Sequence, residues 1–326
     1  MNSLAQLETL AGYQDSFMDA GLWEPYAREA LRRSLAEELV TLRAGKAGTY
    51  PTFIANEQMV IKFFGRLFDG QESYQVEREA ARLLAGQAGI PTARLLGEGR
   101  LFKEGGNWEW PYLIFEMLMG EDMGSADPAL DDEERRSAAR WLGEVTGRIH
   151  ALEIKSNPVF DDTWHAYFTF LNAQRSECFA RLGEWGSLPE HLLAQVEDFL
   201  LPVSELTAPG EQAHLIHGDL TRDHLFGKRA NGRWQATGLI DFGDAMSGSI
   251  YYELAALHLD GLSARPDLLG AFLEAYPLNL RADPLFAHKA LGTALLHRFN
   301  VFAGLPGLKG IGSLEELAER MWSGKY

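Results

Sequence analysis

The chain has 326 residues, with 30 Lys and Arg residues against 46 Asp and Glu residues, so its formal net charge is −16. Hydrophobic residues make up 46% of the chain and charged residues 23%, values that are typical of globular proteins and exclude a disordered or fibrous one. The acidic balance disfavours nucleic acid and anionic membranes as partners, because both attract basic surfaces, and it permits a cationic small molecule.

The cysteine content and the lack of long apolar runs predict the compartment. Cys178 is the single cysteine, so no intramolecular disulfide can form, which favours a reducing environment. The first residues lack a basic and then apolar leader, and no apolar run approaches the roughly 18 residues that span a bilayer. We expect a cytoplasmic protein, and no pattern indicates a protein partner.

The chain divides into a β-rich part and a helical part. A helix begins at Trp23, and β-like runs at 50–54 and 59–64 flank a polar turn, which predicts a hairpin. The further expected elements are, in chain order, a helix at 73–85, strands at 95–97 and 110–116 joined through Gly105 and Gly106, helices at 131–152, 163–183 and 189–205, a β-rich island at 214–241, and helices from about 251 onward.

This order predicts an α+β, bilobal fold. Residues 1–116 would form a lobe with a small antiparallel sheet, and residues 117–326 a mainly helical lobe, with a hinge at 116–120. Ligands bind preferentially in clefts between such lobes.

Two acidic loops carry the strongest chemical signal. His217-Gly-Asp219 places an aspartate on a short loop after an apolar strand, and Asp241-Phe-Gly243 places another at the end of a second apolar strand. Phosphoryl transfer needs a carboxylate that accepts the proton of the attacking hydroxyl, and oxygen or nitrogen ligands that hold Mg²⁺ on the phosphates. Two such loops, emerging side by side from a hairpin, would supply both.

A lysine in an apolar strand completes the pattern. Lys62 lies in Val60-Ile-Lys-Phe-Phe64, and a buried ammonium is costly unless an anion partners it. Glu79 on the following helix is the predicted partner, with Glu77 nearby on the same helix.

The combination resembles the aminoglycoside phosphotransferase family, a branch of the protein-kinase-like fold, and the resemblance covers essentially the whole chain. Segments at 22–28, 60–65, 110–113 and 297–302 are closest in character to the hygromycin phosphotransferases. The resemblance implies that Asp219 is the catalytic base, that Asp241 is the main Mg²⁺ ligand, and that Lys62, paired with Glu79, contacts the nucleotide phosphates.

The resemblance also implies a nucleotide site, for ATP with GTP as the alternative. By position, the Glu116 carbonyl and the Leu118 amide would bind the adenine edge. The phosphate loop would lie near 48–52, with contacts from backbone amides and from Thr49 or Thr52. That loop lacks the Gly-x-Gly-x-x-Gly pattern of protein kinases.

One position departs from the family pattern. The second metal ligand of the family is an asparagine five residues after the catalytic aspartate, where this chain has His224. Imidazole suits Mn²⁺ or Zn²⁺ better than Mg²⁺. Either His224 ligates the ion, with Mn²⁺ as the alternative to Mg²⁺, or Asp223 or a water takes its place.

The predicted function is ATP-dependent O-phosphorylation of a small cationic substrate, an aminoglycoside antibiotic of the hygromycin type, which would confer resistance. The alternatives are a metabolic kinase for choline, homoserine, a thiosugar or a ketosamine, and a nucleotide-binding pseudokinase. If the substrate is a polyamine, the excess acid should concentrate in the C-terminal lobe around Asp219.

Overall fold

The structure is a computed structural model that describes residues 3–102, 108–155 and 157–322. It divides into two compact units: Met1–Met119 with Gly238–Asp244, and Gly120–Thr237 with Ala245–Tyr326. Residues 238–244, which the prediction placed in the C-terminal lobe, therefore group with the first unit. Among the described residues, no helix combines the length and the apolar character needed to cross a bilayer.

The first unit contains a five-stranded sheet in the order β1-β2-β3-β5-β4, with antiparallel neighbours throughout. The predicted hairpin is confirmed, because β2 and β3 pair directly and Thr52 lies opposite Lys62. The predicted glycine connection at 105–106 lies outside the described residues. The strands are β1 (Leu42–Ala44), β2 (Thr52–Ala55), β3 (Met59–Phe63), β4 (Leu95–Arg100) and β5 (Pro111–Glu116).

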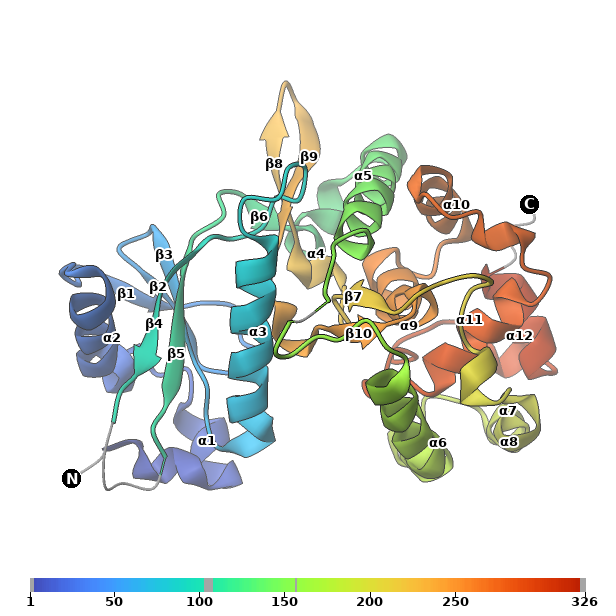
Figure 1. Cartoon of the computed structure of the whole chain (residues 1–326), viewed down its shortest axis with the longest axis horizontal. Helices are drawn as coiled ribbons and strands as arrows, with labels where there is room; N and C mark the ends of the chain where they lie inside the picture. Colours follow the sequence, from blue (N-terminus) through green and yellow to red (C-terminus); the bar gives the residue numbers. More distant parts are fainter. Residues whose placement is uncertain (1–2, 103–107, 156, 323–326) are drawn as a thin grey trace. The chain divides into compact units, whose positions relative to one another are not determined.

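Two helices cover opposite faces of this sheet, α2 (Ala20–Leu35) and α3 (Gly70–Leu84) (Figure 1). Because side chains alternate along a strand, Ile61 and Phe63 join the core on the α2 side, where Trp23 packs against Phe63. The intervening Lys62 therefore projects from the other face, toward α3.

The first unit also contains helical structure that the sequence analysis did not predict. Helix α1 (Leu10–Ser16) precedes α2, and α2 begins three residues before Trp23. It begins there because the Asp19 carboxylate accepts hydrogen bonds from the N–H groups of Gly21 and Leu22, at 2.9 and 3.4 Å.

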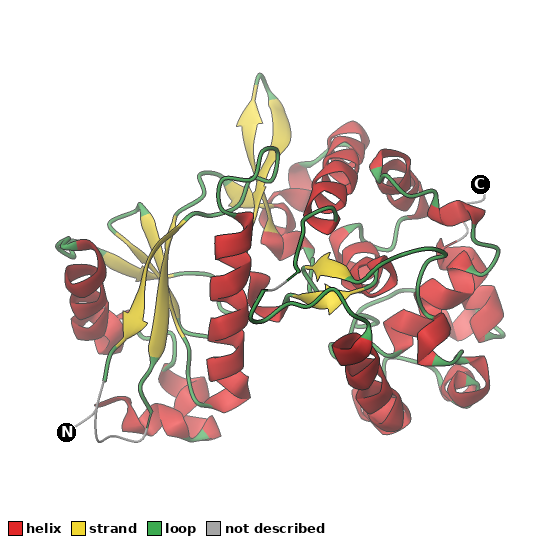
Figure 2. Ribbon diagram, viewed as in Figure 1, coloured by secondary structure: helices red, strands yellow, loops and turns green. Residues whose placement is uncertain are grey.

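The second unit is mainly helical, as Figure 2 shows. Its longest predicted helices are confirmed, and a capping box between Asp131 and Glu134 begins α5. The helices are α4 (Met123–Ala126), α5 (Asp132–His150), α6 (His165–Trp185), α7 (Glu190–Leu193), α8 (Val196–Phe199), α9 (Ile250–Ala256), α10 (Pro266–Ala275), α11 (Phe286–Leu295) and α12 (Leu314–Trp322).

The helix predicted at 189–205 is not continuous. It consists of α7, α8 and a 3₁₀ turn at Val203–Glu205. Pro202 cannot continue a helix, which separates α8 from the 3₁₀ turn. The Gln195 side chain, just before α8, binds the C-terminal segment through the Gly312 carbonyl and the Leu314 N–H.

The strands after residue 120 pair differently from the prediction. β7 (His214–Ile216), which leads to Asp219, pairs with β10 (Met246–Gly248), and the order β6-β8-β9 forms a separate sheet. Asp241 follows β9, so the two acidic loops do not arise from one hairpin. The remaining strands are β6 (Glu121–Asp122), β8 (Leu225–Ala230) and β9 (Arg233–Leu239).

Candidate active site

In the first unit, Lys62 forms ion pairs with two carboxylates. Its Nζ lies 2.8 Å from Glu77 Oε2 and 2.6 Å from Asp241 Oδ1, and the lysine is only 8% exposed. The Nζ also lies 5.7 Å from the centre of the Tyr50 ring and 5.6 Å from that of Phe64. Burial alone would lower the pKa of Lys62, but attraction to Asp241 and Glu77 outweighs it and raises the pKa above the ordinary value.

The predicted partner Glu79 is wrong, and Glu77 takes its place. The Glu79 carboxylate instead pairs with Arg78 and Arg82, at 2.9 and 2.8 Å. Residues two apart on an α-helix are turned by about 200° from each other, so the two glutamates cannot face the same strand. The sequence contained a signal for the correct choice, because Glu77 falls at helical spacing from the hydrophobic residues Tyr74 and Leu84.

Asp241 reaches the lysine because Gly238 and Leu239, at the end of β9, belong to the first unit and pack closely on other parts of it. A Cβ at Gly238 would lie 2.7 Å from the Leu118 side chain, and the Leu239 N–H donates to the Pro91 carbonyl at 3.0 Å. Asp241 itself has φ +65°, a left-handed conformation that costs a non-glycine residue on the order of 1–3 kcal/mol. Strained residues of this kind cluster at functional sites.

The predicted phosphate loop at 48–52 is held from two sides. The Tyr13 hydroxyl of α1 donates to the Thr49 carbonyl at 2.7 Å. The Tyr50 hydroxyl donates to the Phe68 carbonyl and accepts from the Ser73 hydroxyl at 2.9 Å. Thr52 is the cross-strand neighbour of Lys62, so their side chains share one face of the sheet.

The predicted hinge segment is fixed by its backbone. The Glu116 N–H donates to the Arg94 carbonyl at 2.9 Å, and the Met117 N–H donates to the Gln58 carbonyl at 2.8 Å. The Glu116 carboxylate pairs with Arg94, while Leu118 packs against Gly238. The adenine contacts predicted for the Glu116 carbonyl and the Leu118 amide stay predictions.

In the second unit, buried groups brace the peptide that precedes Asp219. The Gly218 N–H donates to Glu253 Oε2 at 2.9 Å, and the Gly218 carbonyl accepts from His297 Nε2 at 3.1 Å. The Asp219 N–H donates to His217 Nδ1 at 3.4 Å. Burial raises the pKa of Glu253 to about 7, against the effect of the backbone hydrogen bonds that it accepts. Sequence analysis missed His297 because it lies far from Gly218 in the chain.

His224 closes the loop that Asp219 begins. Its Nδ1 lies 2.5 Å from the Asp219 carbonyl and 3.1 Å from Thr221 Oγ1. A carbonyl oxygen only accepts, so Nδ1 carries the proton and the lone pair of the neutral ring is on Nε2. Nε2 is therefore the ring atom that could bind a metal.

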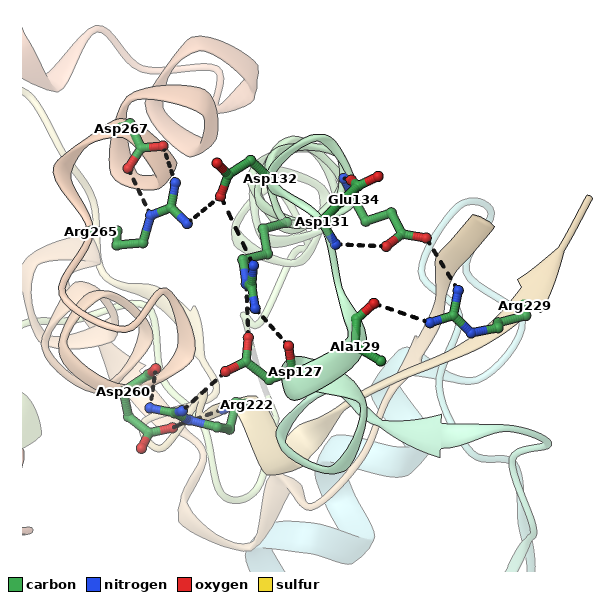
Figure 3. A network of polar contacts seen from close by, with 11 residues as sticks. Asp127, Ala129, Asp131, Asp132, Glu134, Arg222, Arg229, Asp260, Arg265 and Asp267 are labelled. Carbon is green, nitrogen blue, oxygen red and sulfur yellow. Dashed lines mark hydrogen bonds and ion pairs between the residues drawn. The ribbon is translucent and has the colours of Figure 1, made fainter. Parts of the chain in front are cut away.

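Arg222, within the same loop, forms hydrogen bonds to Asp260, which follows α9. Its N–H and its Nε both donate to Asp260 Oδ1, at 3.0 and 3.3 Å, and its Nη2 donates to the Asp260 carbonyl at 3.1 Å. Figure 3 shows this pair beside Asp127, whose carboxylate lies 3.9 Å from the Arg222 guanidinium. Asp260 lies in a π-helical turn, Leu257–Gly261.

Two glycines allow neighbouring elements to approach this loop. A Cβ at Gly124 in α4 would lie 2.2 Å from Asp223 Oδ1. A Cβ at Gly261 would lie 3.1 Å from the Leu220 carbonyl. The loop after Asp219 is thus bounded by α4 and the π-helical turn, which restricts its conformations.

The donor chemistry fits a divalent cation of the magnesium type. Mg²⁺ is usually held by one or two carboxylates together with substrate phosphates and waters, rather than by a cage of protein ligands. Asp241 supplies such a carboxylate, its side chain is 39% exposed, and it lies beside the buried lysine. Within the described ranges, no group of three or more His, Cys, Asp or Glu side chains could hold a metal by itself.

Comparisons with known proteins identify the family and the fold. The profile of the phosphotransferase enzyme family matches residues 41–307. The GDP complex of aminoglycoside 2'-phosphotransferase-IIIa superposes with a TM-score of 0.63 at 18% identity, over 88% of this chain and 92% of that one. The streptomycin and ATP complex of APH(2")-IIa superposes with a TM-score of 0.53 at 20% identity, over 93% of this chain and 98% of that one.

A third solved structure, a thermostable mutant of APH(4)-Ia with AMP-PNP and hygromycin B, gives a TM-score of 0.55 at 19% identity, over 82% of this chain and 88% of that one. These likenesses confirm the predicted bilobal, protein-kinase-like α+β fold. The family match covers both acidic loops and the buried lysine. The chain therefore belongs to the phosphotransferase enzyme family, the family of the aminoglycoside phosphotransferases that its motifs resemble, and is an enzyme with an alcohol group as acceptor.

Proposed function

We propose that the protein transfers the γ-phosphoryl group of ATP to a hydroxyl of an aminoglycoside. The observation that carries the proposal is the buried Lys62, held beside Asp241 in a family whose reaction is phosphoryl transfer. The aminoglycoside class is supported by structural neighbours solved with kanamycin, streptomycin and hygromycin B. Within that class, the hygromycin type is the first to test. GTP is the alternative donor, since neighbours were also solved with GDP.

The residues take the following roles in this proposal. Asp219 accepts the proton of the substrate hydroxyl while the hydroxyl oxygen bonds to the γ-phosphorus. The bond between the γ-phosphorus and the β,γ-bridging oxygen breaks, which releases ADP. Lys62 contacts the phosphates, with Glu77 as its partner in place of Glu79. Asp241 and His224 Nε2 would hold Mg²⁺ or Mn²⁺, which neutralises charge on the phosphates when bound.

The remaining nucleotide contacts come from the first unit. The loop at 48–52 would supply backbone amides and the Thr49 or Thr52 hydroxyl to the phosphates. The Glu116 carbonyl and the Leu118 amide would bind the edge of the base. The supply of ATP places the reaction in the cytoplasm. Phosphorylation adds about 1.5–2 negative charges, which opposes binding of the drug to RNA and so would confer resistance.

The test is nucleotide-dependent phosphorylation of an acceptor panel. The panel contains kanamycin, streptomycin and hygromycin B, with choline, homoserine, a thiosugar and a ketosamine as the metabolic alternatives. We expect turnover with at least one aminoglycoside. Turnover with a metabolic acceptor alone would overturn the aminoglycoside assignment, and binding of nucleotide without turnover of any acceptor would favour a pseudokinase.

The role of Asp219 is tested by its isosteric variant. Asp219→Asn removes the proton acceptor, so kcat should fall roughly 10²–10⁴-fold while nucleotide binding persists. Asp132→Asn, a change of the same kind on the exposed start of α5, serves as the control and should leave kcat unchanged. An Asp219→Asn variant with the kcat of the control would contradict the proposal.

A further inference from the structure

The peptide between Gly218 and Asp219 is held by a residue from the distant end of the second unit. His297 follows α11 and lies 79 residues along the chain from Gly218, yet its Nε2 is 3.1 Å from the Gly218 carbonyl. His297 is fully buried. Because a peptide group is planar, the Gly218 carbonyl and the Asp219 N–H belong to one rigid unit. A bond to that carbonyl therefore restricts the direction in which Asp219 leaves the backbone.

The imidazole of His297 is a fixed donor. The Gly218 carbonyl only accepts, so Nε2 carries the proton, and the Phe299 N–H donates to Nδ1 at 3.2 Å. Each ring nitrogen thus has one partner that agrees with the same neutral tautomer. Burial supports this state by lowering the pKa of His297 to about 4.

Two helices hold His297, one through its ring and the other through its backbone. Tyr252 of α9 stacks on it with ring centres 4.5 Å apart, and the Tyr252 hydroxyl accepts from the Arg298 N–H at 3.3 Å. Arg181 of α6 donates to the His297 carbonyl at 3.4 Å. Helix α9 also carries Glu253, which accepts from the Gly218 N–H. One helix therefore fixes both the N–H and, through Tyr252 and His297, the carbonyl of Gly218.

We propose that His297 is a positioning residue for Asp219, acting through the Gly218 carbonyl. This inference rests on the proposed function, in which Asp219 accepts the proton of the acceptor hydroxyl. Loss of the bond from Nε2 frees the peptide to rotate and displaces the carboxylate. A misplacement of about 1 Å caused by a remote change can cost on the order of 10²-fold in rate. Ground-state binding of nucleotide and acceptor does not depend on this bond.

The experiment compares two polar replacements of similar size. In His297→Gln the amide nitrogen reaches as far from the backbone as Nε2 and keeps a donor for the carbonyl. In His297→Asn the side chain ends at the position of Nδ1 and the donor is lost. We expect kcat to fall roughly 10–100-fold in His297→Asn with both KM values within about threefold, and His297→Gln to recover most of the loss.

His258 provides a matched control. It is also fully buried in the second unit, and its Nε2 lies 2.9 Å from the Met321 carbonyl, beside the Trp322 ring. His258→Asn removes the same kind of bond, made by a side chain that faces Met321 and Trp322 rather than Gly218, so it should lose stability but keep kcat. All variants are assayed at a temperature at which thermal unfolding shows them to be folded. Tyr252→Leu, which removes the stacked ring, should lower kcat in the same way as His297→Asn.

Three results would overturn the inference. The first is a kcat of His297→Asn equal to that of His258→Asn. The second is an equal loss of kcat in His297→Asn and His297→Gln. The third is a His297→Asn variant whose KM rises while its kcat is unchanged. Failure of the proposed function is recognised separately, because it requires Asp219→Asn to retain turnover. If Asp219→Asn is inactive and His297→Asn is fully active, only the positioning role is wrong.

Discussion

At the scale of single residues, Lys62 shows how burial selects partners. A buried ammonium needs compensation, and the structure provides two carboxylates within 2.8 Å of its Nζ. Asp241 is one of them and is also the proposed metal ligand. Under the proposed function, Glu77 would have a second task besides neutralising charge, because it would hold the lysine when Asp241 binds the metal.

The two neighbouring glutamates of α3 make this testable. Glu77→Gln leaves Lys62 with Asp241 alone, so kcat/KM for the nucleotide should fall about 10–100-fold and stability by about 1–3 kcal/mol. Glu79→Gln weakens the pairs with Arg78 and the half-exposed Arg82, neither of which involves Lys62, and should change kcat/KM less than about threefold. Steady-state kinetics with varied nucleotide measures both. Equal effects in the two variants would show that Glu77 does not hold the lysine.

At the scale of elements, α1 supports the predicted phosphate loop from outside the part of the chain that the family profile matches. That match begins at residue 41, whereas Tyr13 of α1 holds the Thr49 carbonyl. The Tyr13 ring stacks on Phe17 and meets the edge of Phe68, so its hydroxyl is fixed in direction. The loop at 48–52 depends on a short helix as well as on its own sequence.

Tyr13→Phe tests this dependence with the loss of one hydroxyl. A hydrogen bond of this kind contributes about 0.5–1.5 kcal/mol, so KM for the nucleotide should rise roughly 2–10-fold while KM for the acceptor stays unchanged. Tyr112→Phe is the matched control, because its buried hydroxyl lies 2.9 Å from Ser34 Oγ, on the α2 side of the sheet. A Tyr13→Phe variant with the KM of Tyr112→Phe would show that α1 does not support the loop.

At the scale of the whole molecule, the negative charge is spread in proportion to length. The first unit contains 18 acidic and 12 basic residues and the second 28 and 18. The second unit is therefore no more acidic per residue than the first, and a concentration of acid around Asp219, expected for a polyamine substrate, stays a prediction. The net charge supports solubility, and the case for an aminoglycoside rests on the family and its structural neighbours.

Buried histidines should make the whole molecule sensitive to acid. Burial lowers the pKa of His214, His258 and His297 to about 4, and that of His150 well below its ordinary value. Between pH 6.5 and about 4, the unfolded chain binds protons at these sites and the folded chain does not, so stability falls as pH falls. Buried glutamates with raised pKa values act in the opposite direction, because the folded chain keeps their protons; they are Glu77, Glu211 and Glu253.

The four histidines outweigh the three glutamates. We expect the free energy of unfolding to drop by roughly 1–2 kcal/mol from pH 6.5 to pH 5, measured by urea titration with tryptophan fluorescence. His258→Asn should abolish or reverse this drop, because it removes the uptake of one proton, which is worth up to about 1.4 kcal/mol per pH unit. A stability that is constant or rises toward pH 5 would contradict the prediction.

Much of the fold and part of the site could be predicted because they depend on local order. Alternation along β3 and helical spacing along α3 are properties of short segments, and so are the two acidic loops. The demand of Lys62 for an anion follows from its apolar neighbours alone. These features determined the two-part α+β fold, the family and the kind of chemistry.

Only the tertiary structure decided which distant groups meet. It selected Glu77 over Glu79, since the turn of α3 against the sheet brings one glutamate and not the other to Lys62. It paired β7 with β10 instead of β9, and it brought His297 to the Gly218 carbonyl. The physical reason is the same in each case. A sequence shows which groups need partners, but the packing of helices and strands determines which partners lie within bonding distance.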